Sequence, residues 1–369
     1  MAESDLIREG QEMLRICNSC RYCEGFCGVW RAMEYRREFP AGDLNYLSNL
    51  CHDCSECYYA CQYAPPHEWA INPPLTFARI RGRAYEQYAW PKALASAFRA
   101  SGLVVALLSA LAFMVFMFAV VYWQGNKALT TAVAGGNFYQ VASHNTLILT
   151  FGVVGLFSAL ALMTGLLRFC RDIGAPLSDL LQPSVLATTF KEVLQLEYLD
   201  GNGWGCTYPG DESSQLRRWF HHFTFYGFML CFAATTLGAI YHYVFGWHAP
   251  HGFLSLPVIL GTLGGIGLLV GPCGLLVMKA SRNREITDEK QSGIDSAFLV
   301  LLLLTSATGL LLLVLRETAA LGLLLVMHLG IVMALFLTLP YGKFVHGLYR
   351  FAAIAKYALE RERKRTLGV

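Results

Sequence analysis

The stretches "CNSCRYCEGFC" (residues 17–27) and "CHDCSECYYAC" (residues 51–61) repeat one cysteine spacing, in which the second, third and fourth cysteines follow after two, two and three residues. Together they hold eight of the twelve cysteines of a 369-residue chain. Bacterial ferredoxins use this spacing to bind [4Fe–4S] clusters. Three cysteines on one tight loop reach three iron corners of a cubane, so the fourth ligand comes from elsewhere. The doubled run therefore predicts two [4Fe–4S] clusters.

The ligand sets follow from the way two-cluster ferredoxins exchange their fourth cysteine between clusters. We expect one cluster on Cys17, Cys20, Cys23 and Cys61, and the second on Cys51, Cys54, Cys57 and Cys27. The 23 residues between the runs read as helical, which favours a helical ferredoxin variant. Structural zinc is the alternative, but its CxxC pairs usually lie a dozen or more residues apart. We interpret the remaining four cysteines as small buried hydrophobes: Cys170, Cys206, Cys231 and Cys273.

The composition changes abruptly near residue 100. Overall, 55% of residues are hydrophobic and only 15% are charged, against about 25% charged residues in an average soluble protein. The segment 101–123 has no charged residue, and a helix needs about 20 apolar residues to cross a membrane. Comparable segments follow, at 145–167, 219–245, 252–278, 296–315 and 319–342. The sequence thus predicts six transmembrane helices.

The orientation follows from the basic residues of the loops. The connections 168–218 and 279–295 and the end from 343 hold 16 Lys or Arg, whereas the opposite connections hold only Lys127 and Arg316. Cytoplasmic loops carry the excess of Lys and Arg. The N-terminus also lacks a signal peptide, so the clustered cysteines should stay reduced and bind metal. We therefore expect a multi-pass protein of the bacterial inner membrane, with both termini in the cytoplasm.

These observations predict an all-α protein with three parts. Residues 1–98 form a cytoplasmic, helical ferredoxin-type domain with two [4Fe–4S] clusters. Residues 99–345 form a six-helix transmembrane haem b domain with a cytoplasmic insert at 170–218, and residues 346–369 form a basic cytoplasmic tail. The basic groups Arg79–Arg83 and Arg217–Arg218 should lie at the cytoplasmic surface, where they would either anchor the protein to anionic lipid or dock a partner protein.

Histidines in the apolar segments predict the haem b. Ionisable residues within a membrane span are functional by default, and paired imidazoles in a helical bundle hold b-type haem. The third segment carries His221, His222 and His242, and the sixth carries His328 and His346. A helix–helix hydrogen bond is the alternative role for a lone membrane histidine. His144, His248 and His251 fall in outer loops and should be ordinary surface residues.

Depth in the membrane suggests how these histidines pair. His328 and His346 are 18 residues apart, which is five turns of one continuous helix. Because the third and sixth helices run in opposite directions, His242 would meet His328 in the outer half of the bilayer. His221 or His222 would meet His346 at the inner surface, with helical periodicity favouring His221. The sequence thus predicts one or two haems b. The glycine-rich "GTLGGIGLLVGPCG" (261–274) fits either close helix packing or room for a porphyrin edge or quinone.

The chain resembles the tricarballylate-utilisation B protein family, also labelled CitB or TcuB. The resemblance rests on the doubled cysteine run together with "HEWAINPP", "GCTYP", "RRWFHHFTFYGF" and "SLPVILGTLGGIGLLVGP". It implies a cytoplasmic FAD-dependent dehydrogenase as partner, one that oxidises tricarballylate to cis-aconitate. The C-terminal part is similar to nitrate-reductase gamma-type haem b subunits, in which a late helix also carries two haem histidines, here His328 and His346.

Both lines of reasoning predict an oxidoreductase component that passes electrons from the reduced FAD of the dehydrogenase to the membrane quinone. The chain has no glycine-rich dinucleotide motif of its own and no expected nucleic-acid partner. A quinol-oxidising subunit that feeds a cytoplasmic reductase is the alternative. A transporter with a structural metal domain is a third possibility, which a colourless purified protein would indicate.

Overall fold

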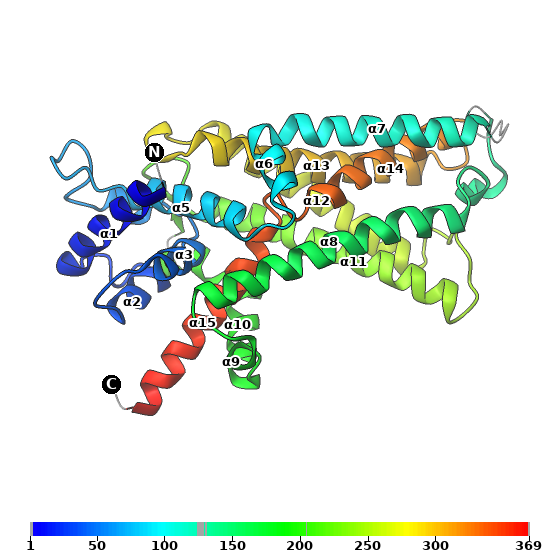
Figure 1. The fold of residues 1–369 in the computed structure, drawn as a ribbon. Helices are drawn as coiled ribbons and strands as arrows, with labels where there is room; N and C mark the ends of the chain where they lie inside the picture. Colours follow the sequence, from blue (N-terminus) through cyan, green and yellow to red (C-terminus); the bar gives the residue numbers. More distant parts are fainter. Residues whose placement is uncertain (1–2, 124–128, 130, 204, 368–369) are drawn as a thin grey trace.

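The computed structural model describes residues 3–123, 129, 131–203 and 205–367, and it is mostly helical (Figure 1). The N-terminal part contains α1 (Glu3–Cys20), α2 (Gly28–Glu34), α3 (Ala41–Leu50), α4 (Glu56–Tyr59), α5 (Pro73–Tyr88) and α6 (Lys92–Ala100). The long helices are α7 (Gly102–Trp123), α8 (His144–Asp172), α11 (Leu216–Tyr243), α12 (Leu256–Ala280), α13 (Glu289–Val314), α14 (Leu321–Thr338) and α15 (Val345–Leu367).

Short elements connect the long helices. Two of them, α9 (Leu177–Leu180) and α10 (Pro183–Gln195), lie in the predicted cytoplasmic insert, as does a two-stranded hairpin. Its strands β1 (Cys206–Thr207) and β2 (Ser213–Ser214) are antiparallel, with Cys206 opposite Ser214. The prediction of an all-helical chain therefore needs this small correction. The turn-rich "DGNGWGCTYPGDESS" contains both strands, and its glycines allow the tight reversal.

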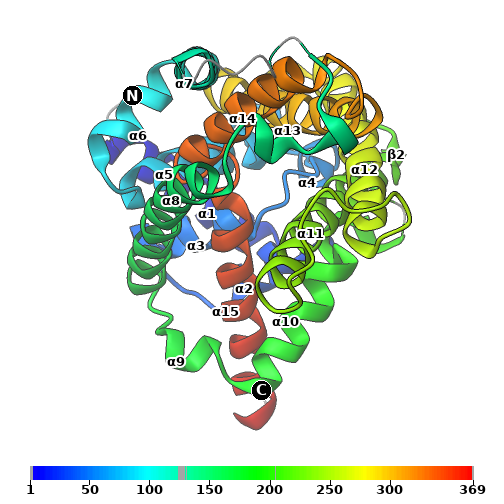
Figure 2. The same ribbon diagram turned by 90° about the vertical axis from the view of Figure 1, so that its right-hand side faces the viewer.

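Among the described residues, five helices are long and apolar enough to cross a membrane: α8, α11, α12, α13 and α14. Residues Lys92–Arg99 and Val104–Ala119, in α6 and α7, form a bent pair with an angle of 109° between its halves, which makes a sixth span if the pair is counted as one. The apolar helices extend together away from α1–α5, and α1 and α15 lie at the same end of the molecule (Figures 1 and 2). This arrangement is consistent with a membrane protein.

The helices α11 and α12 approach each other through glycine. A Cβ on Gly264 would lie 2.8 Å from the backbone nitrogen of Cys231, and a Cβ on Gly271 would lie 2.5 Å from the backbone nitrogen of Thr224. These contacts fill the space that the glycines leave. Of the two interpretations of the glycine-rich segment, close helix packing is therefore the one that the structure supports.

The sixth predicted helix does not continue to its second histidine. Helix α14 ends at Thr338, residues 339–344 form turns, and α15 begins at Val345. Pro340 lacks a backbone N–H and clashes with the preceding turn, so a helix does not continue through it without a kink or break. His328 and His346 thus lie on different helices, and the argument that five continuous turns place them on one face is wrong.

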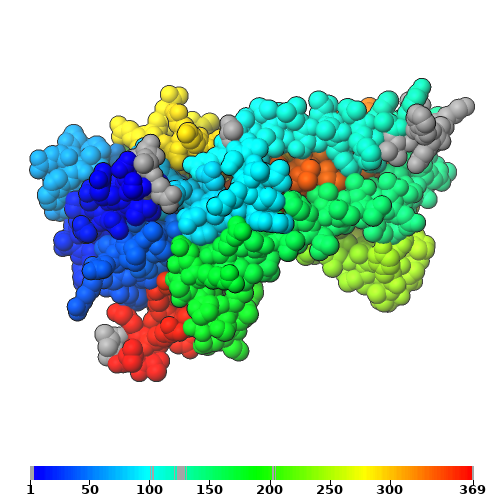
Figure 3. Space-filling view, in the orientation of Figure 1, coloured from blue at the N-terminus to red at the C-terminus, as the bar shows by residue number. Residues whose placement is uncertain are grey.

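The residues predicted as a basic tail pack into the core of the N-terminal part. Tyr349, Ala353 and Tyr357 of α15 are buried in the same hydrophobic cluster as the side chains of α1, α2, α3 and α5. A polar network reinforces the contact, because the Arg36 guanidinium donates to Glu360 at 2.5 Å and to Asp43 at 2.6 Å. In Figure 3, α15 projects beside the N-terminal helices as a continuous part of the molecule.

Candidate functional site

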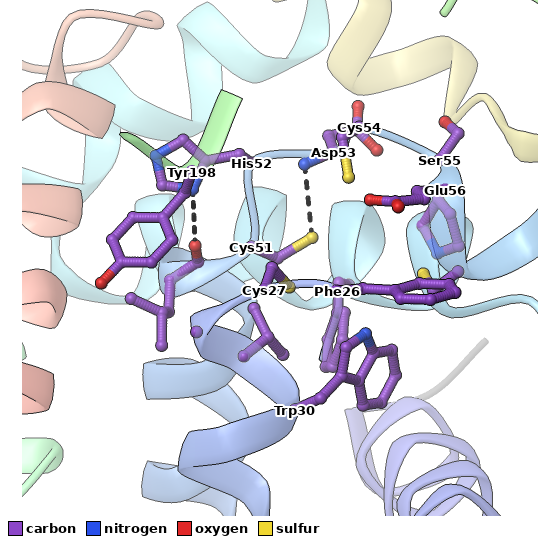
Figure 4. A pocket seen from close by; sticks show the side chains of 16 residues that line it. Phe26, Cys27, Trp30, Cys51, His52, Asp53, Cys54, Ser55, Glu56 and Tyr198 are labelled. Carbon is purple, nitrogen blue, oxygen red and sulfur yellow. Dashed lines mark hydrogen bonds between the residues drawn. The ribbon is translucent and has the colours of Figure 1, made fainter. Parts of the chain in front are cut away.

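Patterned cysteines line two pockets in the N-terminal part of the molecule. The distal pocket is lined by Cys17, Cys20, Cys23 and Cys61. The proximal pocket, nearer the apolar helices, is lined by Cys27, Cys51, Cys54 and Cys57 (Figure 4). Cys57 also borders the distal pocket. These are the two sets that the sequence assigns to the two clusters, so the lining supports the assignment, and ligation itself stays a prediction.

The donor set of the pockets fits a group larger than a single ion. In the described part of the chain, no three His, Cys, Asp or Glu side chains come close enough to hold one metal ion. Four sulfurs spread around a space suit the separated iron corners of a cubane.

Strained backbone forms the cysteine loops. Arg21, between Cys20 and Cys23, has a φ of 55°, and Asp53, between Cys51 and Cys54, has a φ of 58°. Ser55 follows with a φ of 68°. Left-handed conformations cost about 1–3 kcal/mol at such residues, and they concentrate at sites that clamp ligands. The loops therefore bend sharply enough to direct successive sulfurs to one side.

The thiols crowd one another. Burial and the neighbouring thiols of Cys61 and Cys20 raise the pKa of Cys23 to about 12. Burial and the thiols of Cys54 and Cys51 raise the pKa of Cys27 well above its usual value. At neutral pH these groups hold their protons unless a metal displaces them. Binding of an iron–sulfur cluster would consequently release protons from both pockets.

A ninth cysteine packs beside the proximal pocket. Cys206 on β1 is fully buried in a hydrophobic cluster that Cys54 contacts, and its thiol donates to the carbonyl oxygen of Leu199 at 3.5 Å. Thr207 holds the strand in place, since its hydroxyl donates to the carbonyl oxygen of Cys54 at 3.2 Å. The interpretation of Cys206 as a small buried hydrophobe is confirmed. Of the other three, Cys170 is buried, Cys231 is half-buried and Cys273 is exposed, so the interpretation is wrong for Cys273.

Two long helices hold the loop of the proximal pocket. On α11, the Arg217 guanidinium donates to the carbonyl oxygens of Asp53 at 2.7 Å and His52 at 2.9 Å. On α15, Arg350 donates to the carbonyl oxygen of Cys51 at 2.7 Å. The prediction that Arg217 is a surface anchor or docking residue is wrong, because its guanidinium is directed into the protein.

A histidine lies one helical turn from each of these two arginines. His221 on α11 and His346 on α15 face each other, with ring centroids 6.1 Å apart and ring planes at 77°. Two imidazoles on opposite sides of one metal ion have nitrogens about 4 Å apart and centroids about 6 Å apart, since each metal–nitrogen bond is about 2.0 Å. The pair therefore has the spacing of two axial ligands.

The ring nitrogens are also arranged as ligands require. Nδ1 of His346 contacts the carbonyl oxygen of Lys343 at 2.5 Å, so this nitrogen carries the proton and Nε2 keeps its lone pair. Such a second bond orients metal-binding histidines. Nδ1 of His221 is buried and has no hydrogen-bond partner. The two residues fit a haem iron between them.

His222 has different neighbours. Its ring stacks on that of Tyr226 at 5.6 Å between centroids, with planes at 14°. It also lies 6.2 Å from the ring of Trp219. Of the two candidates that the sequence left open, the structure brings His221 to His346.

The predicted outer pair does not come together in this way. The ring of His242 stacks on His144 at 4.0 Å between centroids, and its Nδ1 lies 3.0 Å from Nδ1 of His248. His328 instead contacts the hydroxyl of Thr308 on α13 at 3.0 Å. These contacts give His328 the helix–helix hydrogen bond that was the alternative for a membrane histidine. They also gather His144, His242 and His248 into one exposed group at the far end of α8 and α11.

Sequence reasoning missed the arginines that surround the proximal pocket, whereas it placed His52 beside the clusters in a packing or tuning role. His52 is buried, and its Nδ1 contacts the carbonyl oxygen of Leu50 at 2.8 Å. The four-residue spacings Arg217–His221 and His346–Arg350 were visible in the chain. These spacings can be interpreted only once the structure shows that α11 and α15 contact the same loop.

Comparisons with known proteins match the whole length of the chain. Residues 96–367 match the family described as citrate utilization protein B, and residues 10–89 match the Fer4-like domain of that protein. A relative from Escherichia coli with the description "Citrate utilization protein B" is 49% identical over 362 residues, which cover 98% of this chain and 94% of the relative. No solved structure matches. The Fer4-like match indicates an iron–sulfur, electron-transfer oxidoreductase component.

Proposed function

Because this chain belongs to the citrate utilization protein B family, we propose that it is the membrane subunit that reoxidises a cytoplasmic flavoprotein. The partner is an FAD-dependent dehydrogenase that acts on a tricarboxylic acid, with tricarballylate as the substrate that the sequence resemblance implies. Electrons enter at the cysteine pockets and leave to the quinone pool of the bacterial inner membrane. The description of the relative as a citrate utilization protein supports a role in tricarboxylate use.

One observation carries the proposal. The loop of the proximal pocket is hydrogen-bonded to Arg217 and Arg350, each one turn from the facing residues His221 and His346. Residues four apart on a helix lie on the same face. The cysteine pocket and the histidine pair thus share the same two helices, which directly connects a soluble redox site to the membrane part.

Each group of residues has a role in this scheme. The eight cysteines bind two [4Fe–4S] clusters, in the sets Cys17, Cys20, Cys23, Cys61 and Cys51, Cys54, Cys57, Cys27. His221 and His346 hold one haem b, which would supply a one-electron carrier at the cytoplasmic side of the helices. The contacts of His242 and His328 support no second haem, so we propose a single haem b per chain.

The orientation belongs to the same proposal. Both chain ends lie in the cytoplasm, as the excess of basic residues in the connections on that side supports. The distal pocket then faces the flavoprotein, and its border residues Arg21, Tyr22 and Glu24 are exposed. The proximal pocket is covered by α11, α15 and the hairpin. Electrons from a soluble donor therefore meet the distal site first.

The test is a reduced-minus-oxidised visible spectrum of the purified full chain, with iron, sulfide and haem quantified. We expect about eight non-haem irons and one haem b per chain. Addition of the substrate-reduced flavoprotein should reduce the clusters and the haem, and addition of a water-soluble quinone should then reoxidise them, with matching changes in the absorption bands. A colourless protein, or one that holds its bands unchanged through both additions, would contradict the proposal.

A further inference from the structure

Four arginines from four separate elements converge on the loop Leu50–Cys54 of the proximal pocket. We call them the arginine cage: Arg81 on α5, Arg217 on α11, Arg282 after α12 and Arg350 on α15. The loop is short, and all four side chains contact it or the turn that leads into it. Such a convergence of like charges costs energy, so a compensating role is expected.

Two members of the cage bind the first part of the loop. Nη1 of Arg81 donates to the carbonyl oxygens of Ser48 at 2.9 Å and Cys51 at 3.1 Å. Arg350 donates from Nη2 to the carbonyl oxygen of Cys51 at 2.7 Å. Arg81 is only 2% exposed. The carbonyl oxygen of Cys51 therefore accepts hydrogen bonds from two guanidinium groups, one of them buried.

The other two members bind the second part. Arg217 donates to the carbonyl oxygens of His52 and Asp53, and Arg282 forms a two-pronged ion pair with the carboxylate of Asp53 at 2.8 and 2.9 Å. Both guanidinium groups lie over the ring of Tyr208, at 4.6 and 5.0 Å from its centroid. The aromatic face and the carboxylate together make the close approach of these two cations possible.

The charge balance of the two pockets differs. Four guanidinium groups bind the loop of the proximal pocket, and the carboxyl groups of Asp53 and Glu56 line that pocket. The distal pocket is lined by Arg21 and Glu24. Both side chains are exposed to solvent, and their charges are opposite. Water screens exposed charges, whereas buried ones act at a lower effective dielectric constant. The proximal pocket is thus the more positive environment.

We propose that the arginine cage sets the direction of electron transfer, by giving the proximal site a higher reduction potential than the distal site. Net charge and solvent exposure are among the factors that set the potentials of iron–sulfur sites. Reduction adds one negative charge, which the cage stabilises. One electron then moves from the distal site, which is oxidised, to the proximal site, which is reduced, and no bond forms or breaks. This inference rests on the proposed function.

The experiment is a redox titration of the full chain in nanodiscs, followed by electron paramagnetic resonance. The Cys20→Ala variant assigns the signals, because it leaves the proximal site intact. We expect the proximal site of the unmodified chain to be reduced first. In Arg350→Gln, the ratio of reduced to oxidised proximal site, measured at the midpoint potential of the unmodified chain, should fall about tenfold. This estimate is the effect of removing one unit charge at roughly 10 Å with an effective dielectric constant of about 20.

Three control variants separate charge from structure. Arg350→Lys keeps the charge and should stay near the original midpoint. Arg21→Gln removes an exposed charge at the distal pocket and should leave the proximal midpoint unchanged. Arg168→Gln removes a guanidinium that donates to the backbone carbonyl of Ala89, away from both pockets, and should change neither.

The outcomes distinguish this inference from the proposed function. Fewer than two clusters in the unmodified chain would overturn the proposed function itself. Two clusters with the distal site reduced first would overturn the inference and favour transfer from quinol toward the cytoplasm. An unchanged proximal midpoint in a fully loaded Arg350→Gln protein would also overturn it. If Arg350→Gln does not fold, the order of reduction in the unmodified chain still decides.

Discussion

The imidazole rings of His221 and His346 face each other at the junction of α11 and α15, with centroids 6.1 Å apart. Each ring lies one turn from an arginine that binds the loop of the proximal pocket. The histidine pair and the proximal pocket are therefore neighbours that the same two helices hold in place. Because they consist of different side chains, substitutions can test each of them separately.

Replacing either facing histidine should remove the haem. His346→Ala and His221→Ala each delete one of the two histidines that we propose hold the haem, so we expect haem content to fall to less than about a tenth of the unmodified value, in line with tenfold or greater losses when even outer partners of a metal site are removed. The non-haem iron should be retained. Pyridine haemochrome and iron assays on the purified variants measure both quantities.

The adjacent histidine provides the matched control for this test. His222→Ala should keep its haem, because that ring stacks on Tyr226 and does not face His346. His328→Ala should keep it as well, since His328 contacts Thr308. Loss of haem from His222→Ala with retention in His221→Ala would show that His222, and not His221, is the ligand. A partial loss of haem from His328→Ala would support a second haem.

Each cysteine set should account for half of the non-haem iron. Cys20→Ala and Cys54→Ala should each lose about four of about eight irons, because each removes one corner ligand of a single cluster. Membrane insertion should survive, since the apolar helices need no iron. Cys170→Ala, a buried position away from both pockets, is the control. Full iron content in both pocket variants would show that these cysteines are not ligands.

The buried thiol of Cys206 should pack beside the proximal cluster without binding it. It lies in a hydrophobic cluster that Cys54 contacts, and it donates to the carbonyl oxygen of Leu199 at 3.5 Å. Cys206→Ala should thus keep all non-haem iron in an iron assay, and Cys206→Ser, which can still donate to Leu199, should keep it as well. Loss of about four irons from Cys206→Ala would instead make Cys206 a ligand.

The contact of α11 with α12 should be sensitive to single methyl groups. Gly264→Ala places a Cβ 2.8 Å from a backbone atom of α11, so we expect a loss of about 1–3 kcal/mol in stability and weaker haem retention, because His221 is on α11. At Gly261 a Cβ would sit 3.6 Å from Ala234, an ordinary contact. Gly261→Ala should therefore be neutral or stabilising by up to about 1 kcal/mol. Thermal unfolding in detergent compares the two, and equal effects would count against backbone crowding as the cause.

Local patterns predicted the parts of this fold that depend on neighbours in the chain. The predicted span 145–167 lies within α8, and 219–245 nearly coincides with α11, because an apolar run long enough to cross a membrane has few other stable forms. The cysteine spacing likewise anticipated which sulfurs share a pocket, since three of each set lie within seven consecutive residues.

Contacts between distant segments were not predictable in the same way. Pro340 was visible in the sequence, but the 18-residue spacing of His328 and His346 suggested a continuous helix and outweighed it. The roles of Arg217 and Arg350 depend on which loop their helices meet. The seven lysines, arginines and histidines from residue 346 onward concealed the burial of α15, although small and aromatic residues recur along one face of the helix.

The burial of α15 among the first helices of the chain has a consequence for biogenesis. A ribosome makes this segment after the apolar helices that precede it in the chain, so the core of the N-terminal part stays open until α15 has been synthesised. Iron delivered earlier would meet a loop that still lacks Arg350. We therefore expect the cysteine pockets to be loaded only after the apolar helices have been made, and a chain that stalls midway would stay unmetallated and visible to proteases.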